Sequence, residues 1–175
     1  MVIGIDKTIQ SKAGFFSKKI EMLPFKSKAP LFEFTNQHSK KLHLSDFIGQ
    51  KIIVLYFYPK DFTPGCTAQA CSFRDEYEEF VEHGAEVIGI SGDSNDSHTQ
   101  FSTRYSLPFH LATDVDGSIR RMYDVPTGFF GVLFSRITYI IDLNGHIVWS
   151  YKSNLAPKSH VAEALKVIKS LSKHH

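Results

Sequence analysis

The chain contains two cysteines, Cys66 and Cys71, which lie five positions apart. A thiolate is both a nucleophile and a metal ligand, so two thiols at this spacing are candidates for redox chemistry or for metal binding. Cys66 directly follows Pro64-Gly65, a turn-forming pair that comes after the most apolar run of the sequence at 52–58. We therefore take the two cysteines as the first candidates for chemistry.

Metal binding is the weaker interpretation of these cysteines. A structural zinc site needs four ligands, mostly Cys and His, and the chain has no second cysteine pair to complete such a set. An iron–sulfur cluster fails for the same reason. We expect no metal and no other cofactor. A redox-active thiol is the best remaining interpretation, and two inert buried cysteines are the alternative.

The residues around the cysteines predict a strand followed by a helix. The run 52–58 is apolar throughout, as in a strand buried on both faces, and apolar residues at 73, 77, 80 and 81 predict a helix over about 66–82. A helix N-terminus favours a thiolate over a thiol. Residues i and i+5 of a helix have Cα atoms about 8–9 Å apart, whereas a disulfide spans at most roughly 7 Å. Cys66 and Cys71 therefore either never pair or pair only if the first one or two turns unwind.

Three further residues of this stretch have a structural and a functional interpretation. Thr63 is a candidate helix N-cap, but its hydroxyl is also within reach of the thiolate or of a bound oxygen substrate. Pro59 ends the strand, and its ring could also shield the sulfur from water. We expect Lys60 and Asp61 to lie on the surface of the turn.

The elements that would position this stretch alternate between strands and helices. Strands are expected at 31–34, 42–44, 52–58, 86–91 and 109–112, and helices or helical turns at 45–47, 66–82, 98–105 and 119–123. Asn144-Gly145 between the strand-like runs 136–142 and 146–151 predicts an antiparallel hairpin, and an amphipathic helix starts near Pro157. This order predicts an α/β protein of thioredoxin-like fold, with a mixed central sheet flanked by helices.

Length and composition indicate one ordinary globular domain. The chain has 175 residues, of which 42% are hydrophobic, and a net charge of +2. We expect an N-terminal extension at 1–25 and a single domain at 26–175, acting as a monomer without nucleic acid or membrane as partner. No run approaches the roughly 18 apolar residues of a membrane span. We expect a cytoplasmic protein, or an organellar one if residues 1–20 derive from a transit peptide.

The motif Pro59-x-x-x-Thr63-x-x-Cys66 resembles the active-site motif of peroxiredoxins. The longer run 56–75 is similar to the peroxiredoxin Q, or bacterioferritin-comigratory, subfamily. The similarity continues through 84–91 and Arg136-x-Thr138-Tyr139-x-Ile141-Asp142, and it covers about residues 28–170. The N-terminal segment and the Phe-rich stretch 129–134 depart from the subfamily pattern.

The resemblance implies a thiol peroxidase that reduces hydrogen peroxide and alkyl hydroperoxides. In such an enzyme Cys66 attacks the peroxide and Cys71 resolves the sulfenic acid in an intramolecular disulfide, which thioredoxin or a similar dithiol reductant recycles. Thr63 and Pro59 belong to the site. Arg136 alone would be interpreted as a surface residue at a strand end, but the family places an arginine beside the thiolate. Arg74 is a weaker candidate, expected to pair with Asp75 or Glu78.

Three other function classes fit the sequence less well. A binding module with inert cysteines would show no peroxide-dependent oxidation. A disulfide reductase or isomerase is disfavoured because the chain has no C-x-x-C motif. A glutathione peroxidase needs a tryptophan near the nucleophile, and the single tryptophan, Trp149, lies on the late hairpin.

Overall fold

A five-stranded mixed sheet is the centre of the molecule. The computed structural model describes residues 22–127 and 133–172. The strand order is β5-β4-β3-β6-β7, in which β3 pairs parallel with β4, β4 parallel with β5, and β6 antiparallel with both β3 and β7. The strands are β3 (Ile52–Phe57), β4 (Ala85–Ser91), β5 (His110–Thr113), β6 (Ile137–Ile141) and β7 (Ile147–Lys152).

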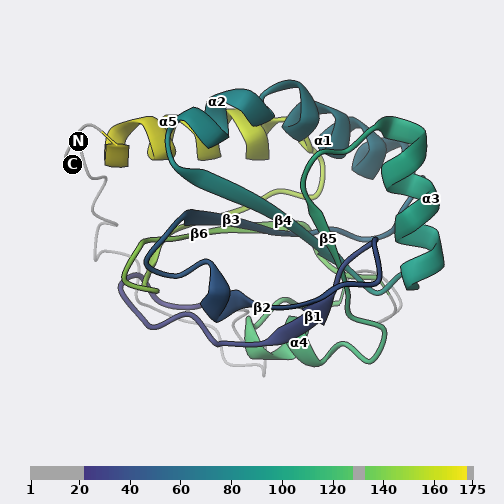
Figure 1. Ribbon diagram of the computed structural model, residues 1–175, viewed down its shortest axis with the longest axis horizontal. Coiled ribbons are helices and arrows are strands. Elements are labelled where there is room, and N and C mark those ends of the chain that lie inside the picture. Colours follow the sequence, from purple (N-terminus) through teal and green to yellow (C-terminus); the bar gives the residue numbers. More distant parts are fainter. Residues whose placement is uncertain (1–21, 128–132, 173–175) are drawn as a thin grey trace, which may run out of the picture.

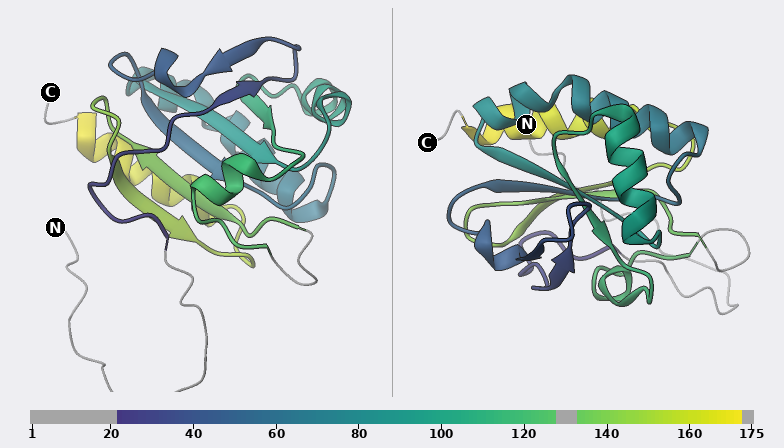
Figure 2. Two further views of the ribbon diagram at one scale, coloured as in Figure 1. Left: turned by 90° about the horizontal axis from the view of Figure 1, so that it is seen from below. Right: turned by 45° about the vertical axis from the view of Figure 1, so that its right-hand side comes forward.

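Helices lie on both faces of this sheet, as Figure 1 shows. One face is covered by α1 (Pro64–Asp75), α2 (Tyr77–Glu82) and α5 (Ser159–Ser172), and α3 (Asn95–Tyr105) lies beside β5. Against the other face lie α4 (Ser118–Met122) and a separate antiparallel pair, β1 (Glu33–Thr35) and β2 (Lys41–His43), followed by the short 3-10 helix η1 (Leu44–Asp46) (Figure 2). The predicted α/β class, a mixed sheet flanked by helices, is confirmed.

The central strand β3 connects two hydrophobic layers. All six of its residues are buried, and successive side chains point to opposite faces of the sheet. Ile53, Leu55 and Phe57 pack in the layer shared with β1, β2 and α4, whereas Val54 and Tyr56 pack in the layer under α1, α2 and α5. Because both faces are covered, β3 has no polar alternation and reads as a continuous apolar run.

The helix expected over 66–82 begins earlier than predicted and is interrupted. It starts at Pro64, in the first helical position, where the missing N–H of proline costs nothing. At Glu76 the backbone leaves the α region (φ −99°, ψ 4°), and this residue separates α1 from α2. The apolar spacing at Phe73, Tyr77 and Phe80 continues across the break, so the sequence pattern suggested one helix.

The C-terminal half of the chain follows the predicted order. β6 and β7 form the antiparallel hairpin around Asn144-Gly145, and α5 begins at Ser159. Upstream, the segment 26–29 hydrogen-bonds along the start of β7, with Lys26 N donating to Ile147 O. Residues 1–21 and most of the Phe-rich stretch 129–134 lie outside the described residues, so the division of the chain at residue 25 stays a prediction.

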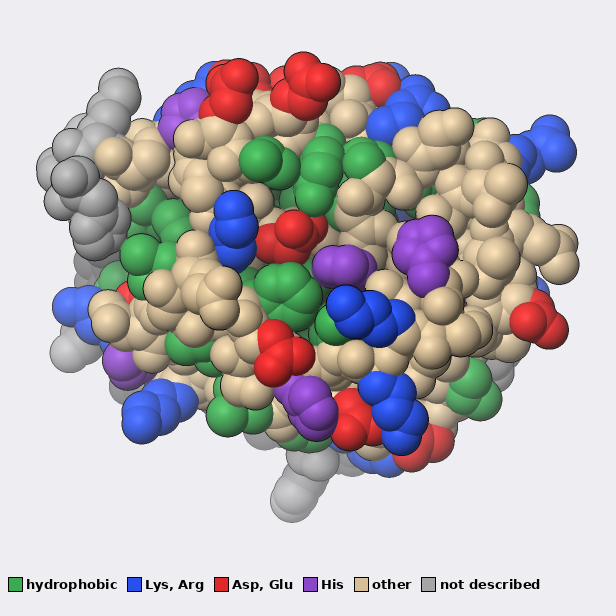
Figure 3. Space-filling view, viewed as in Figure 1, with side chains coloured by type: hydrophobic (Ala, Val, Ile, Leu, Met, Phe, Trp, Pro, Cys, Tyr) green, Lys and Arg blue, Asp and Glu red, His purple; other side chains and the backbone are tan. Residues whose placement is uncertain are grey.

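The surface carries charges of both signs. On the side shown in Figure 3, lysine and arginine side chains alternate with carboxylates and do not merge into one basic patch. Within residues 22–127 and 133–172, none of the helices combines the length and the apolar character needed to cross a bilayer.

A buried histidine, His160, fixes the start of α5 to the sheet. Its Nε2 lies 2.9 Å from the Ser153 carbonyl oxygen, which can only accept, so Nε2 carries the proton. Its Nδ1, 2.8 Å from the Thr138 hydroxyl oxygen, then accepts a hydrogen bond. Burial, with a smaller contribution from the positive charge of Arg136, lowers the pKa of His160 to about 4. The histidine is therefore neutral in the folded protein at neutral pH.

This lowered pKa predicts an acid-sensitive contribution to stability. Between about pH 4 and the unfolded value near 6.5, the unfolded chain binds more protons than the folded one. Stability from neutral His160 is thus fully present above about pH 6.5 and is lost as the pH falls toward 4. The unfolding free energy difference between wild type and His160→Gln should shrink by about 2 kcal/mol between roughly pH 7 and pH 4.5.

Denaturant unfolding at the two pH values measures this difference. His146→Gln, at a partly exposed turn position beside Asp142, is the matched control and should show no comparable change. A wild-type to His160→Gln difference that is equal at both pH values contradicts the prediction.

Candidate active site

The junction between β3 and α1 places Cys66 in the first turn of a helix. Thr63 is the N-cap, with extended backbone angles (φ −72°, ψ 149°), and Cys66 is the third helical residue. The Thr63 hydroxyl makes no capping bond and instead donates to the Lys60 carbonyl oxygen at 2.9 Å. The N–H groups of this first turn receive no side-chain cap from Thr63, which leaves their partial positive charge available to an anion.

Cys66 is more deeply buried than its position after a turn suggested. The residue is only 2% exposed and packs in the layer that contains Tyr56, Ala70 and Phe73. The cause is that α1 begins at Pro64, which puts Cys66 inside the helix and turns its side chain toward the sheet.

Arg136 lies beside the Cys66 sulfur. Its Nη2 donates to Cys66 Sγ at 3.5 Å, and its backbone N–H donates to Asn154 Oδ1 at 2.9 Å. The residue is 4% exposed, so the interpretation as a surface arginine at a strand end does not hold. Gly65 permits this approach, since a Cβ there would lie 3.2 Å from Arg136 Nη2. A buried guanidinium at this distance places a positive charge and a hydrogen-bond donor beside the sulfur.

Gln69 holds Arg136 in this position, and the sequence analysis did not identify it. Its Oε1 accepts a short hydrogen bond from Arg136 Nη1, and the residue is fully buried. The available signal was the spacing from Cys66, because residues three apart share one face of a helix. Gln69 Nε2 and Arg136 Nε are buried without a hydrogen-bond partner in the described part of the chain. Two donors beside the sulfur are thus unused, which suits a site that receives an oxygen ligand.

Aromatic rings pack against this cluster. Tyr56 stacks on Phe73 with ring centroids 4.6 Å apart and on Tyr58 at 5.3 Å. Burial, and next the negative charge of Asp61, raise the pKa of Tyr56 well above its usual value, so its hydroxyl stays neutral. Gly89 on β4 makes room for the ring, since a Cβ there would lie 2.6 Å from it.

Cys71 lies five residues further along the same helix and does not face Cys66. Both cysteines are free, and α1 is continuous from Pro64 to Asp75. Helix geometry separates the two Cα atoms by about 8–9 Å, beyond the reach of a disulfide. The structure therefore corresponds to the reduced protein.

The other candidate residues of this region differ in how deeply they are buried and in what they contact. Pro59 is half-buried after β3 and Lys60 is exposed, as expected for a turn. Arg74 pairs with Asp75 at 2.8 Å, one of the two partners expected for it. In the described part of the chain, no three His, Cys, Asp or Glu residues are placed to hold a metal ion.

The prediction that Asp61 lies on the surface of the turn is wrong. Asp61 is 4% exposed, and its carboxylate lies 2.6 Å from the Tyr58 hydroxyl and 2.8 Å from Nδ1 of His98. A carboxylate is buried only where donors compensate for its lost water. One of these donors comes from α3, more than thirty positions later in the chain, so the local sequence gave no sign of it.

Comparison with known proteins places this geometry in a family. The AhpC/TSA family matches residues 25–150. Peroxiredoxin Q, chloroplastic, of Oryza sativa subsp. japonica is 47% identical over 145 residues, which are 83% of this chain and 66% of the rice protein. The protein of the same name from Sedum lineare is 46% identical over 145 residues, 83% of this chain and 77% of that protein. The chain thus spans slightly less than two thirds of the rice relative.

Two bacterial proteins with solved structures share this architecture. Peroxidoxin BcpB from Mycobacterium tuberculosis superposes with a TM-score of 0.79 at 30% identity, covering 84% of this chain and 97% of that one. Peroxiredoxin Q of Xanthomonas campestris superposes with a TM-score of 0.74 at 29% identity, covering 81% and 91%.

The cluster around Cys66 predicts how its reactivity depends on Gln69. Gln69→Leu keeps the volume but removes the acceptor for Arg136 Nη1, so the guanidinium loses its orientation. Alkylation of Cys66 by iodoacetamide should slow by about fivefold, the equivalent of one lost hydrogen bond. Arg136→Ala should slow it further, and Arg136→Lys should restore part of the loss because lysine keeps the charge but not the planar fork.

Mass spectrometry of the Cys66 peptide against time gives these rates. Gln50→Leu is the matched control, because Gln50 is exposed and its side chain donates to the Asp46 carbonyl oxygen, away from Cys66. Equal alkylation rates in wild type and Gln69→Leu would show that Gln69 does not orient Arg136.

Proposed function

The chain belongs to the AhpC/TSA family of thiol peroxidases, in its peroxiredoxin Q group, and on that premise we propose that it reduces peroxides with Cys66 as the attacking thiol. The observation that carries this role is the position of Cys66, in the first turn of α1 and 3.5 Å from the buried guanidinium of Arg136. Both features place positive charge at the sulfur, where a thiolate nucleophile would carry its negative charge.

In the proposed reaction the Cys66 thiolate attacks one oxygen of the peroxide. The S–O bond forms as the O–O bond breaks, and the leaving oxygen takes up a proton and departs as water or an alcohol. Cys66 becomes a sulfenic acid. Arg136 and the first-turn N–H groups stabilise charge on sulfur and on the leaving oxygen, while Thr63 orients the substrate and Pro59 shields the sulfur.

Hydrogen peroxide and alkyl hydroperoxides are the proposed substrates. An apolar environment of Tyr56 and Phe73 around a buried thiol suits small peroxides with an alkyl group. The bacterioferritin comigratory protein of Xanthomonas campestris, 29% identical, is described for alkyl peroxide reduction activity, which supports the same class here.

Cys71 is the proposed resolving thiol. Its sulfur attacks the Cys66 sulfenic acid, an S–S bond forms, and the hydroxyl leaves as water. Thioredoxin or a similar dithiol partner then reduces the disulfide by exchange. Cys71 is half-buried on the same helix, so pairing with Cys66 needs no second chain, which fits a monomer.

The plant relatives favour the organellar alternative over a cytoplasmic location. The rice and Sedum lineare proteins are named chloroplastic, and residues 1–20, which would carry an import signal, lie outside the described residues. The compartment reached by a fluorescent fusion of the full chain decides between the two locations.

Replacing the attacking thiol tests the proposed activity. Cys66→Ser should abolish peroxide consumption in an assay coupled to thioredoxin, because a neutral hydroxyl is a far poorer nucleophile than a thiolate. Cys71→Ser is the matched control: it should keep the first oxidation of Cys66 but stop turnover, leaving sulfenic and sulfinic Cys66 visible by mass. Peroxide consumption at the wild-type rate by Cys66→Ser would disprove the assignment.

Disulfide formation should unwind the start of α1. Because the two Cα atoms are too far apart in an intact helix, oxidation should open roughly the first one to two turns and expose the disulfide to its reductant. Backbone amides of residues 66–75 should then exchange hydrogen much faster in the oxidised protein, while strand β3 stays protected by burial on both faces.

Hydrogen exchange of reduced and peroxide-treated protein measures this change. Cys71→Ser treated with peroxide cannot form the disulfide and should keep the exchange pattern of the reduced protein. If residues 66–75 are equally protected in reduced and disulfide-bonded protein, disulfide formation does not unwind the start of α1.

A further inference from the structure

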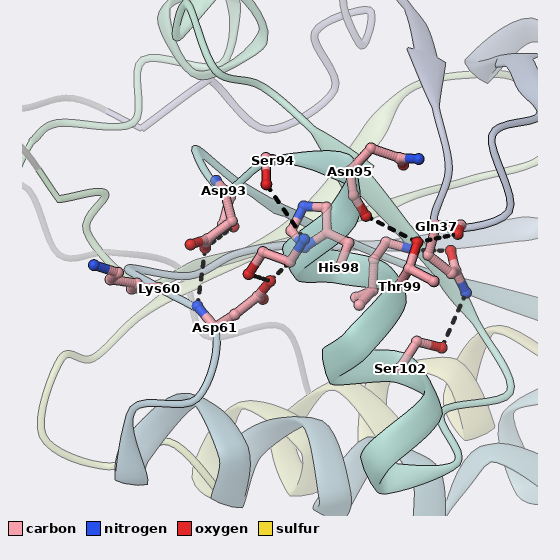
Figure 4. Close-up of polar contacts among 12 residues, drawn as sticks. Gln37, Lys60, Asp61, Asp93, Ser94, Asn95, His98, Thr99 and Ser102 are labelled. Carbon is pink, nitrogen blue, oxygen red and sulfur yellow. Dashed lines mark hydrogen bonds and ion pairs between the residues drawn. The ribbon is translucent and has the colours of Figure 1, made fainter.

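A buried acid–base pair lies beside the Cys66 loop but outside the cluster around the sulfur. Asp61 Oδ2 and His98 Nδ1 are 2.8 Å apart, and their side chains are 1% and 0% exposed. Figure 4 shows the two side chains facing each other between the loop after β3 and the first turns of α3. None of the roles assigned so far uses this pair.

The pair connects the loop to three other elements. The Asp61 carboxylate accepts hydrogen bonds from the Tyr58 hydroxyl at 2.6 Å and from the Ser97 hydroxyl on α3 at 2.8 Å. The Asp61 backbone N–H donates to Asp93 Oδ2, just after β4, at 2.9 Å. On its other side, His98 Nε2 lies 3.3 Å from the Ala112 carbonyl oxygen on β5. The position of Asp61 is therefore determined by β4, α3 and β5 together.

Such a hydrogen-bond network fixes the positions of its members more than it contributes to the free energy of unfolding. Buried polar groups lose their hydration, and this loss is compensated only when hydrogen bonds satisfy their donor and acceptor atoms. Both ring nitrogens of His98 face oxygen atoms, and both oxygens of the Asp61 carboxylate have donors. A fully satisfied buried network holds its members in one arrangement.

The residue after Asp61 needs this restraint. Phe62 has φ +63°, in the left-handed region, which is unfavourable for a bulky side chain. Its ring packs edge-on against Phe101 of α3, with centroids 5.1 Å apart. The left-handed turn at Phe62 directs the chain into Thr63, the N-cap of α1, and so sets where Cys66 lies relative to Arg136.

We propose that Asp61 and His98 are positioning residues for Cys66: their contact holds the left-handed turn at Phe62, and this turn keeps the Cys66 sulfur next to Arg136. The catalytic part of this inference rests on the proposed peroxidase function. The position of the Cys66 sulfur, however, can be tested without peroxide. Neither residue touches the peroxide.

Near-isosteric variants test the proposal. Asp61→Asn and His98→Gln replace the carboxyl and the imidazole with amides and retain most of the volume. In the folded proteins, both the peroxide reaction of Cys66 and its alkylation by iodoacetamide should slow by about tenfold or more, since displacement of a reacting group by about 1 Å has large effects on rate. His146→Gln, a histidine that contacts Asp142 on the β6–β7 turn, is the matched control and should react like wild type.

A double variant separates one shared contact from two independent roles. Because Asp61 and His98 act through the same contact, Asp61→Asn combined with His98→Gln should be no slower than the slower single variant. A pair with only a structural role would lower the unfolding free energy and leave the alkylation rate of the folded protein at the wild-type value. That result, or additive slowing in the double variant, would overturn the proposal.

Ser97→Ala tests the proposal if Asp61→Asn and His98→Gln do not fold. It deletes one donor to the Asp61 carboxylate and leaves the contact between Asp61 and His98 in place. A slowing of alkylation by about twofold or more supports the proposal, and an unchanged rate overturns it. If wild type is alkylated at Cys66 but consumes no peroxide, the proposed function is wrong. The effect of Asp61 and His98 on Cys66 is then still measured by the rates of alkylation with iodoacetamide.

Discussion

The contact between Arg136 and the Cys66 sulfur joins residues 70 positions apart, and the rest of the site depends on it. The antiparallel pairing of β3 with β6 makes it possible. Phe57, the last residue of β3, pairs with Ile137, the first of β6. Because β6 runs in the opposite direction, the residue that precedes it lies at the end of the sheet from which the Cys66 loop emerges. A parallel strand would have placed Arg136 at the opposite end of β3.

The surrounding residues hold Arg136 close to the Cys66 sulfur and shield the contact from solvent. Gln69 orients the guanidinium from α1, Gly65 leaves room for its approach, and the stacked rings of Tyr56 and Phe73 close the site from below. Each of these residues lies on an element adjacent to the end of β3. The site is therefore a local property of one end of the sheet, although its members come from distant parts of the sequence.

The elements that could be predicted from the sequence are those that short-range patterns encode. Continuous apolar residues identified β3, and Asn144-Gly145 identified the hairpin of β6 and β7. The position of Arg136 beside the sulfur was expected only through the resemblance to a family, because its place before a strand carries no sign of burial. Asp61 was misplaced and Gln69 was overlooked, since the partners that bury them lie on other elements. A pattern of neighbours along the chain does not contain such contacts.

The distance between Arg136 and Cys66 along the chain also has a consequence during synthesis. The ribosome adds Cys66 early and Arg136 much later, and β6 must follow and pair with β3 before the guanidinium reaches the sulfur. Until then the cysteine lacks its neighbouring guanidinium, because long-range pairing forms late and slowly. In an unfinished chain Cys66 therefore lacks this neighbour, and the cluster around its sulfur forms together with the completed sheet.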